Sequence, residues 1–151
     1  MTRNLALLAA LGSAGMLLGA FAFEHLGDLP PCKMCIWQRW PHGLAAALGV
    51  VAWRMGNRTL GAICGLIVLV GAGIAFYHTG VEQSWWEGPS TCTSSPIGIL
   101  TTEELLAQIQ NAPLVRCDEI AWSLFGLSMA AWNGVISLGL AALWGMFARR
   151  A

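Results

Sequence analysis

Four long apolar stretches dominate the pattern of hydrophobic and polar positions along the chain. They cover residues 5–23, 36–53, 59–81 and 120–148, and only the second contains a charged residue, Arg39. A helix needs roughly 17–25 predominantly apolar residues to cross a bilayer. Inside lipid every backbone polar group must be paired within the structure, and continuous apolar runs without strict alternation favour helices over strands. The pattern therefore predicts an all-α membrane protein built as a four-helix transmembrane bundle.

The composition of the chain supports this interpretation. Hydrophobic residues make up 56% of the sequence and charged residues only 11%, whereas soluble domains carry about 25% charged residues. The formal net charge is zero, so the chain lacks the basic surface that nucleic-acid binding requires. We expect a single membrane domain over residues 1–151 and no nucleic-acid partner.

Charge distinguishes the two ends of such a bundle. Arginines lie at both termini and in the short turn of residues 54–58 on one side. Every acidic residue falls in the loops on the other side, residues 24–35 and 82–119. Cytoplasmic loops are enriched in Lys and Arg. We therefore expect both termini in the cytoplasm and both of these loops outside it.

The first apolar stretch has a second interpretation, a cleaved signal peptide. A basic start precedes an apolar core and small residues, as in such peptides. The apolar core is longer than the roughly 7–15 residues that are usual there. Cleavage would also conflict with the distribution of arginines, so we favour a membrane span.

The longer outer loop contains an amphipathic segment. In the stretch TTEELLAQIQ, Thr101 and Glu104 form a capping box, and apolar residues follow on one helical stripe. We expect a short helix that either lies on the membrane surface or packs over the bundle. Trp85 and Trp86 would be its neighbouring interfacial anchors.

The chain has five cysteines, and four of them fall in the outer loops. Cys32 and Cys35 belong to the first loop, Cys92 and Cys117 to the second, and Cys64 to the third apolar stretch. Disulfides form and persist in compartments outside the cytoplasm. We expect Cys64 to be a small apolar residue of the helix packing.

Three roles are open to the four loop cysteines. A zinc site is disfavoured because only one closely spaced pair is present, while the second pair is 25 residues apart. A static disulfide between Cys92 and Cys117 would stabilise the fold by about 3–4 kcal/mol through loop closure. A Cys-x-x-Cys pair can also form an exchangeable disulfide that passes electrons. At the mouth of a membrane bundle, such a pair would meet a lipid-dissolved electron acceptor.

Arg39 lies one helical turn after Cys35 and therefore on the same helix face. A charge at that depth is costly unless it is paired, so charges inside membranes are candidates for function. The alternative is that Arg39 extends its head group to the interface. A guanidinium there would hydrogen-bond a quinone carbonyl and stabilise the negative charge that develops as electrons arrive.

The segment CKMCIWQR resembles the Cys-x-x-Cys-x-x-x-Arg signature of the bacterial disulfide bond formation protein B (DsbB) family. These proteins are membrane quinone reductases that reoxidise the periplasmic thiol oxidase DsbA. The likeness continues in YHTGVEQSWWEGPSTC and in CDEIAWSLFGLSMAAWN, and it covers nearly the whole chain. Ala130 stands where many members have proline.

This resemblance implies a quinone-dependent thiol oxidase of the bacterial inner membrane, an enzyme that generates disulfides by dithiol:quinone oxidoreduction. Its partners would be a periplasmic DsbA-like dithiol protein and the membrane quinone pool, with ubiquinone or menaquinone as the cofactor. Carried onto matching positions, the family's roles make all four loop cysteines catalytic. Electrons would pass from the partner to Cys92 and Cys117, then to Cys32 and Cys35, and finally to the quinone.

The same resemblance assigns quinone binding to Arg39, Cys35 and His78. For His78, at the outer end of the third apolar stretch, capping of a helix explains its position equally well. No metal site is expected. Two other functions stay open: a membrane scaffold stapled by disulfides without redox turnover, and a quinone reductase like the vitamin K epoxide reductases, whose sequence patterns fit less well.

Overall fold

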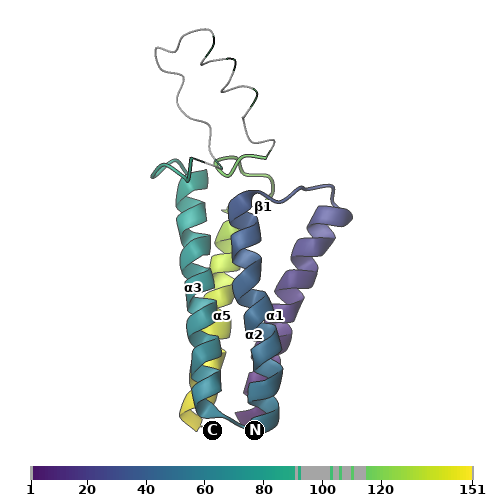
Figure 1. Cartoon of the computed structure of the whole chain (residues 1–151), viewed down its shortest axis with the longest axis vertical. Helices are drawn as coiled ribbons and strands as arrows, with labels where there is room; N and C mark the ends of the chain where they lie inside the picture. Colours follow the sequence, from purple (N-terminus) through teal and green to yellow (C-terminus); the bar gives the residue numbers. More distant parts are fainter. Residues whose placement is uncertain are drawn as a thin grey trace.

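The computed structural model describes residues 2–90 and 115–150 and, between them, residues 92, 103, 106 and 110 (Figure 1). Long helices dominate this part of the chain. They are α1 (Thr2–His25), α2 (Lys33–Met55), α3 (Arg58–Glu82) and α5 (Met129–Arg150).

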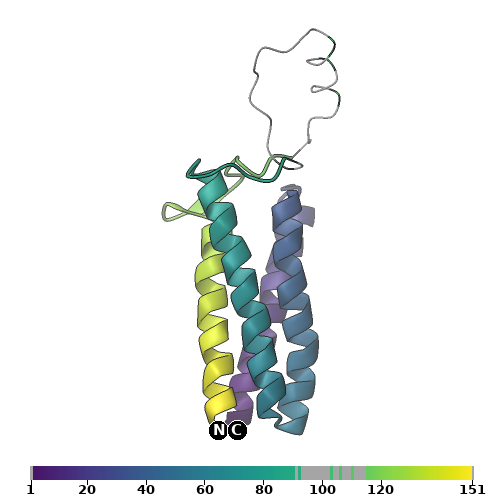
Figure 2. The ribbon, with the colours of Figure 1, turned by 60° about the vertical axis from the view of Figure 1, so that its left-hand side comes forward.

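The helices run up and down side by side, with α1 against α2 and α3 against α5 (Figures 1 and 2). Both termini lie at the same end as the turn between α2 and α3 (Figure 1). The opposite end carries the other two connections. The predicted four-helix transmembrane bundle is confirmed.

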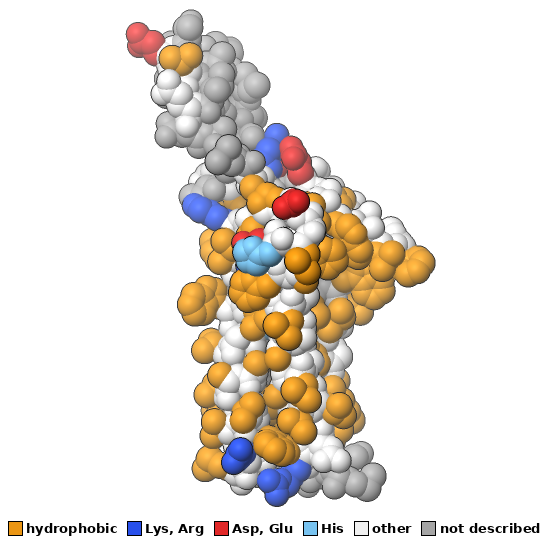
Figure 3. Space-filling view, turned by 90° about the vertical axis from the view of Figure 1, so that its right-hand side faces the viewer, with side chains coloured by type: hydrophobic (Ala, Val, Ile, Leu, Met, Phe, Trp, Pro, Cys, Tyr) orange, Lys and Arg blue, Asp and Glu red, His pale blue; other side chains and the backbone are white. Residues whose placement is uncertain are grey.

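Helix length and surface both suit a bilayer. The helices have 22 to 25 residues, which at 1.5 Å per residue gives roughly 33–38 Å, enough for a hydrocarbon core of about 30 Å. Three of them, α1, α3 and α5, are also apolar enough to cross a membrane. Hydrophobic side chains cover the shaft of the bundle (Figure 3). Helix α2 is less apolar because Gln38, Arg39 and His42 interrupt it.

Local sequence signals set the ends of α2 and α3. Cys32 caps the start of α2, because its sulfur accepts a hydrogen bond from the backbone N–H of Cys35. Gly56 ends α2 with a φ of 63°, a left-handed conformation that favours glycine. Asn57 then caps α3 by accepting a 3.0 Å hydrogen bond from the Leu60 N–H. The two helices are therefore joined by a minimal turn.

Small residues allow the helices to approach closely in the half of the bundle near the termini. A methyl group added at Gly49 would lie 2.8 Å from both Ala10 Cβ and Trp144 Cζ2, and one at Gly61 would lie 2.4 Å from Phe147 Cδ1. Trp144 and Phe147 are completely buried. Such small-against-large packing replaces the hydrophobic effect as the stabilising force between helices in lipid.

The fourth predicted stretch, residues 120–148, does not form one helix. It begins with a small hairpin in which β1 (Ser123–Leu124) pairs antiparallel with β2 (Leu127–Ser128). Figure 2 shows this hairpin projecting sideways beside the end of α5. The prediction that helix starts at residue 120 was wrong, because an apolar run alone does not distinguish a short hairpin from a helix.

The hairpin has its own sequence signal. Phe125 and Gly126 form its two-residue turn, with φ values of 52° and 78°. Positive φ at both positions is typical of the type I′ turn that joins tightly connected strands. Ser128 then starts α5 as its cap, since its hydroxyl oxygen accepts a 3.2 Å hydrogen bond from the Ala131 N–H.

Two further predictions concern the longer outer loop. The amphipathic segment around Thr101 and Glu104 lies outside the described residues. Trp85 and Trp86 follow α3 with well-exposed indole rings. Trp86 stacks on Tyr77 and donates a 2.9 Å hydrogen bond to its carbonyl oxygen, so at least this ring is held against the helix end.

Candidate functional site

Cys32 and Cys35 form a thiol pair at the start of α2. Helix α2 begins at Lys33, three residues before the predicted start at residue 36, so Cys32 caps the helix and Cys35 lies in its first turn. Their sulfur atoms are 2.9 Å apart, with the Cys32 thiol donating to Cys35. A helix start places the backbone N–H groups and the positive end of the helix dipole beside the sulfurs. This position favours negative charge on the pair.

The second pair is a disulfide, and it docks directly on the first. Cys92 and Cys117 are bonded to each other, both are almost completely buried, and the Cys117 N–H donates a 2.9 Å hydrogen bond to the Cys92 carbonyl. They pack with Cys32, Met34 and Val81. The sulfur atoms of Cys32, Cys92 and Cys117 all lie within 4.8 Å of one another. The two cysteine pairs therefore share one site.

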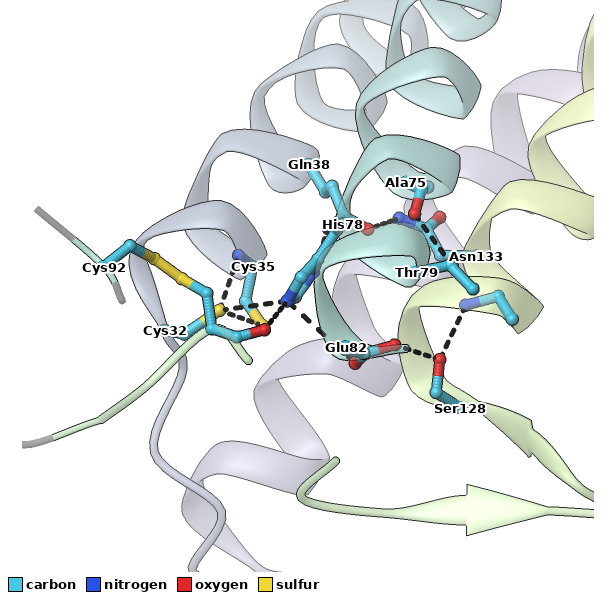
Figure 4. A network of polar contacts seen from close by, with 12 residues as sticks. Cys32, Cys35, Gln38, Ala75, His78, Thr79, Glu82, Cys92, Ser128 and Asn133 are labelled. Atoms are coloured by element: carbon cyan, nitrogen blue, oxygen red, sulfur yellow. Dashed lines mark hydrogen bonds and ion pairs between the residues drawn. A yellow bond between two sulfur atoms is a disulfide. The ribbon is translucent and has the colours of Figure 1, made fainter. Parts of the chain in front are cut away.

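His78 connects the disulfide to the thiol pair from the outer end of α3 (Figure 4). Its Nε2 lies 3.2 Å from the carbonyl oxygen of Cys117 and 3.6 Å from Cys32 Sγ. A carbonyl oxygen only accepts hydrogen bonds, so Nε2 must carry the proton. Gln38 occupies the other ring nitrogen, Nδ1, at 2.8 Å. His78 thus holds Cys117 in place and points an N–H at Cys32.

The protonation of His78 bears on whether these residues favour a metal. Cys32, Cys35 and His78 have potential ligand atoms within 4.8 Å of one another, as a metal site would need. A ligating imidazole nitrogen must be bare, yet Nε2 carries its proton toward Cys117. In this arrangement Nε2 is engaged with Cys117 and is not free to bind a metal.

A chain of polar side chains continues from His78 into the bundle. Gln38 Oε1 accepts a 2.6 Å hydrogen bond from Asn133 Nδ2, and Asn133 Oδ1 lies 2.9 Å from His42 Nε2. Ser137 completes the group, 3.3 Å from both Asn133 Oδ1 and His42 Nε2. Gln38, His42 and Ser137 are buried. These hydrogen-bonded side chains join α2, α3 and α5 in the outer half of the bundle.

Glu82 is a further buried group at the end of α3. Its side chain is 5% exposed and its Oε1 lies 4.0 Å from His78 Nε2. It also accepts a short hydrogen bond from the Ser128 hydroxyl, the cap of α5. Figure 4 shows Glu82 between His78 and Ser128. Glu82 therefore links the end of α3 to the start of α5 and lies beside the histidine.

Arg39 has a partner, which explains how its charge is tolerated at that depth. It donates a 2.5 Å hydrogen bond to Glu24 at the end of α1, and its guanidinium lies 4.9 Å from the centre of the Phe21 ring. Both charged side chains are about four-fifths buried. Because a guanidinium has five donors, the ion pair leaves Arg39 able to bind a further acceptor.

A cavity of about 400 Å³ opens beside these groups, between α1, α2, α5 and the hairpin. Its walls are largely apolar and come from residues such as Met16, Phe23, Trp122, Met129, Trp132 and Ile136. Cys35, Arg39, His42, His78 and Glu82 supply polar groups along the same wall. A mostly apolar cavity of this size with a few convergent polar groups is typical of a site for a small molecule or cofactor.

Comparison with known proteins agrees with this geometry. The family model described as "Disulfide bond formation protein DsbB" matches residues 2–147. The chain belongs to the DsbB family. It is accordingly a disulfide-generating oxidoreductase and a multi-pass protein of the bacterial inner membrane.

Similar proteins of this family come from several bacteria, and each carries the name "Disulfide bond formation protein B". The chain is 27% identical to the protein of Stutzerimonas stutzeri over 97% of its own length and 96% of the relative. It is 32% identical to that of Xanthomonas campestris pv. campestris, covering 94% and 87%. It is 31% identical to that of Alkalilimnicola ehrlichii, covering 99% and 95%. No solved structure matches the chain.

The structure brings together most of the residues that the DsbB resemblance selects. The four loop cysteines and His78 form one cluster, and Arg39 lies on the cavity wall beside Cys35. Cys64 lies away from them in the apolar core. Six further polar residues complete the site and were not predicted from the sequence. They are Glu24, Gln38, His42, Glu82, Asn133 and Ser137.

Proposed function

We propose that this protein oxidises the dithiol of a periplasmic DsbA-like protein and delivers the electrons to a membrane quinone. The observation that carries the proposal is the shared sulfur site, in which Cys32 Sγ lies within 4.8 Å of both sulfurs of the Cys92–Cys117 disulfide. A disulfide that only stabilised its own loop would have no reason to lie against the thiol pair of the other loop. Thiol–disulfide exchange requires one sulfur to reach another.

The first step takes electrons from the partner. A thiolate of the reduced partner attacks the Cys92–Cys117 disulfide and forms a mixed disulfide with Cys92, while Cys117 leaves as a thiolate. The second thiol of the partner then attacks the mixed disulfide. The partner departs as a disulfide, and Cys92 and Cys117 remain as a dithiol that holds the two electrons.

The second step transfers these electrons within the protein. A thiolate of the Cys92/Cys117 pair attacks Cys32 of the Cys32–Cys35 disulfide, and Cys35 leaves as a thiolate. The remaining thiol attacks the new bond, which re-forms the Cys92–Cys117 disulfide and releases Cys32. The arrangement in the structure, a closed outer disulfide beside a thiol pair, corresponds to the end of this step.

Two features support this division of roles between Cys32 and Cys35. The pKa of Cys32 is raised above its ordinary value, chiefly because its thiol donates a hydrogen bond to Cys35 and also because it is buried. Cys32 therefore keeps its proton while Cys35 accepts that hydrogen bond. The His78 N–H, 3.6 Å from Cys32 Sγ, stabilises negative charge on this sulfur during exchange.

The residues around the cavity fit a quinone. The cavity wall is largely apolar, Cys35 and Arg39 lie on it, and a buried nitrogen of His42 has no hydrogen-bond partner in the described part of the chain. When bound, a quinone accepts two electrons and two protons, which balances the closing of the Cys32–Cys35 disulfide. We assign Cys35 as the thiolate beside the ring and Arg39 as the donor to a ring oxygen.

His78 also lines the cavity, but both of its nitrogens already have partners. We therefore place its action at the sulfur atoms, where it orients Cys117, and only indirectly at the ring. For the orientation in the membrane, we propose that both termini face the cytoplasm. Basic side chains at the terminal end of the bundle (Figure 3) support this.

The test follows quinone absorbance with purified protein in detergent and a reduced thioredoxin-fold dithiol protein. We expect partner-dependent quinone reduction that disappears in Cys35→Ser and persists in Cys64→Ala, which removes a cysteine outside the site. Separate runs with ubiquinone and menaquinone identify the acceptor. Reduction of neither quinone by folded protein, or full activity in Cys35→Ser, would refute the proposal and favour a scaffold stapled by disulfides.

A further inference from the structure

The buried polar chain from His78 to His42 has a defined hydrogen-bond direction. Its members lie among membrane-spanning helices, where polar side chains are costly and mark functional positions by default. Each link joins two groups of which one must donate and the other accept. Once the hydrogen bond between His78 and Cys117 is assigned, the proton positions of the other polar side chains in this series therefore follow.

The carbonyl of Cys117 fixes the first link. Because that oxygen only accepts, His78 carries its proton on Nε2, and Nδ1 of the neutral ring is an acceptor. Gln38 must then present its NH2 group to Nδ1 at 2.8 Å, which turns its oxygen toward Asn133. Asn133 must donate to that oxygen, and its own oxygen faces His42.

The last link determines the protonation of His42. Asn133 Oδ1 is an acceptor 2.9 Å from His42 Nε2, so Nε2 carries the proton. The remaining nitrogen of the neutral ring, Nδ1, has only a lone pair to offer. This atom is buried and has no hydrogen-bond partner within residues 2–90 and 115–150 or the single residues described between them. His42 itself is 3% exposed and lines the cavity.

His42 lines the cavity, and its unpaired buried acceptor favours a ligand that donates a hydrogen bond. We propose that His42 Nδ1 accepts a hydrogen bond from a hydroxyl of the reduced ring, the quinol, and that the cavity therefore binds quinol more tightly than quinone. The inference rests on the proposed function for the class of ligand. It adds the residue that distinguishes the two oxidation states, because a quinone has only carbonyl oxygens, which cannot donate to a bare nitrogen.

Arg39 and His42 complement each other in this respect. The Arg39 guanidinium has only donors and suits a carbonyl or negatively charged ring oxygen. His42 presents an acceptor and suits a hydroxyl. The two residues are three apart on α2 and line the same cavity, and three-residue spacing places side chains on one helix face. One ring can therefore meet a donor and an acceptor from the same helix.

Preference for the reduced ring has a direct redox consequence. Tighter binding of quinol than of quinone raises the reduction potential of the bound pair, which makes it a stronger oxidant of the Cys32/Cys35 dithiol. For a two-electron couple a tenfold preference corresponds to about 30 mV. A single hydrogen bond to a buried neutral acceptor supplies roughly this tenfold factor.

The first experiment reads the proton positions in the unmodified protein. The chain has three histidines, so selective ¹⁵N labelling gives three imidazole spectra, with the exposed His25 as an internal control. We expect His42 and His78 each to show a protonated Nε2 and a bare Nδ1. Added quinol should shift the His42 Nδ1 signal, and added quinone should not. A protonated His42 Nδ1, or equal shifts with both rings, would overturn the inference.

The second experiment measures the two affinities directly. In a Cys35→Ser background, which prevents electron transfer, the dissociation constants of a short-chain benzoquinone and its quinol are measured by tryptophan quenching. We expect His42→Leu to weaken quinol binding about tenfold and quinone binding less than twofold, and His25→Leu to change neither. Equal losses would assign His42 a packing role only. Binding of neither ring by the parent would instead refute the proposed function.

Discussion

The shared sulfur site predicts that a bridge between the two loops forms in a protein that retains only Cys32 and Cys117 of the four loop cysteines. The variant Cys35→Ala/Cys92→Ala creates this situation. In the structure these two sulfurs lie within 4.8 Å of each other. A small movement of the loop is enough to reach bonding distance, so oxidation should join Cys32 to Cys117.

The preference for a Cys32–Cys117 bridge over a glutathione adduct follows from the short distance between the two sulfur atoms. A thiol confined to a sphere of radius 4.8 Å around another has an effective concentration of about 4 M, an upper limit because the loop is freer without its own disulfide. Against glutathione at about 5 mM this is roughly a thousandfold, or about 4 kcal/mol in favour of the internal bridge. The bridge should therefore dominate over glutathione adducts in an oxidising glutathione buffer.

The assay is counting of free thiols by alkylation and mass spectrometry of the bridged peptide. The matched control is Cys32→Ala/Cys92→Ala, which retains Cys35 and Cys117. The Cys35 sulfur lies within 4.8 Å of Cys32 and His78 but does not belong to the cluster of Cys32 with Cys92 and Cys117. Cys35 and Cys117 should therefore bridge far less. Equal bridging in both variants, or glutathione adducts alone in the first, would refute the shared site.

Three further changes test packing, capping and electrostatics. Gly49→Ala should lower stability by about 1–3 kcal/mol because the new methyl group meets rigid neighbours at 2.8 Å, whereas Gly73→Ala, with open space around it, should not lower it. Ser128→Ala should cost about 1 kcal/mol by removing the cap of α5. Arg116→Gln should raise the pKa of Asp118, which the Arg116 hydrogen bond holds below its ordinary value; stability contributed by this lowered pKa is present above about pH 4 and is lost as pH falls through the lower folded value.

Thermal unfolding in one detergent checks the first two changes, and carboxyl ¹³C titration by NMR checks the third. Equal stability of both glycine variants would mean that the helices separate at no cost. An unchanged melting temperature without the serine would show that the hairpin alone starts the helix. An acidic side chain at position 118 that titrates identically in both proteins would contradict the ion pair.

The sequence was sufficient to predict the helix bundle and the location of both cysteine pairs at one end of it. Uninterrupted apolar runs allow few structures in a membrane, so helix number and order were predicted correctly. Positions of the cysteines relative to these runs placed both pairs at one end. The start of the last helix was missed, because Phe125 and Gly126 form a turn inside an apolar run and only local backbone conformation reveals it.

The polar chain was also missed, although a signal exists. Gln38 with His42, and Asn133 with Ser137, are polar pairs four residues apart inside apolar stretches. Spacing of this kind places each pair on one helix face, and polar residues inside a membrane call for partners. Which face meets which depends on how α2, α3 and α5 pack, and one sequence does not contain that information.

The position of the cavity has a consequence for bioenergetics. The innermost polar group on its wall, His42, lies nine residues into α2, about 14 Å from the outer end of that helix at 1.5 Å per residue. On the proposed function, electrons and protons enter and leave from one face of the bilayer, and no net charge traverses its full thickness. Moving one charge across costs about 2.3 kcal/mol per 100 mV of membrane potential. The reaction should therefore be electrically silent, and its rate should be the same in energised and de-energised vesicles.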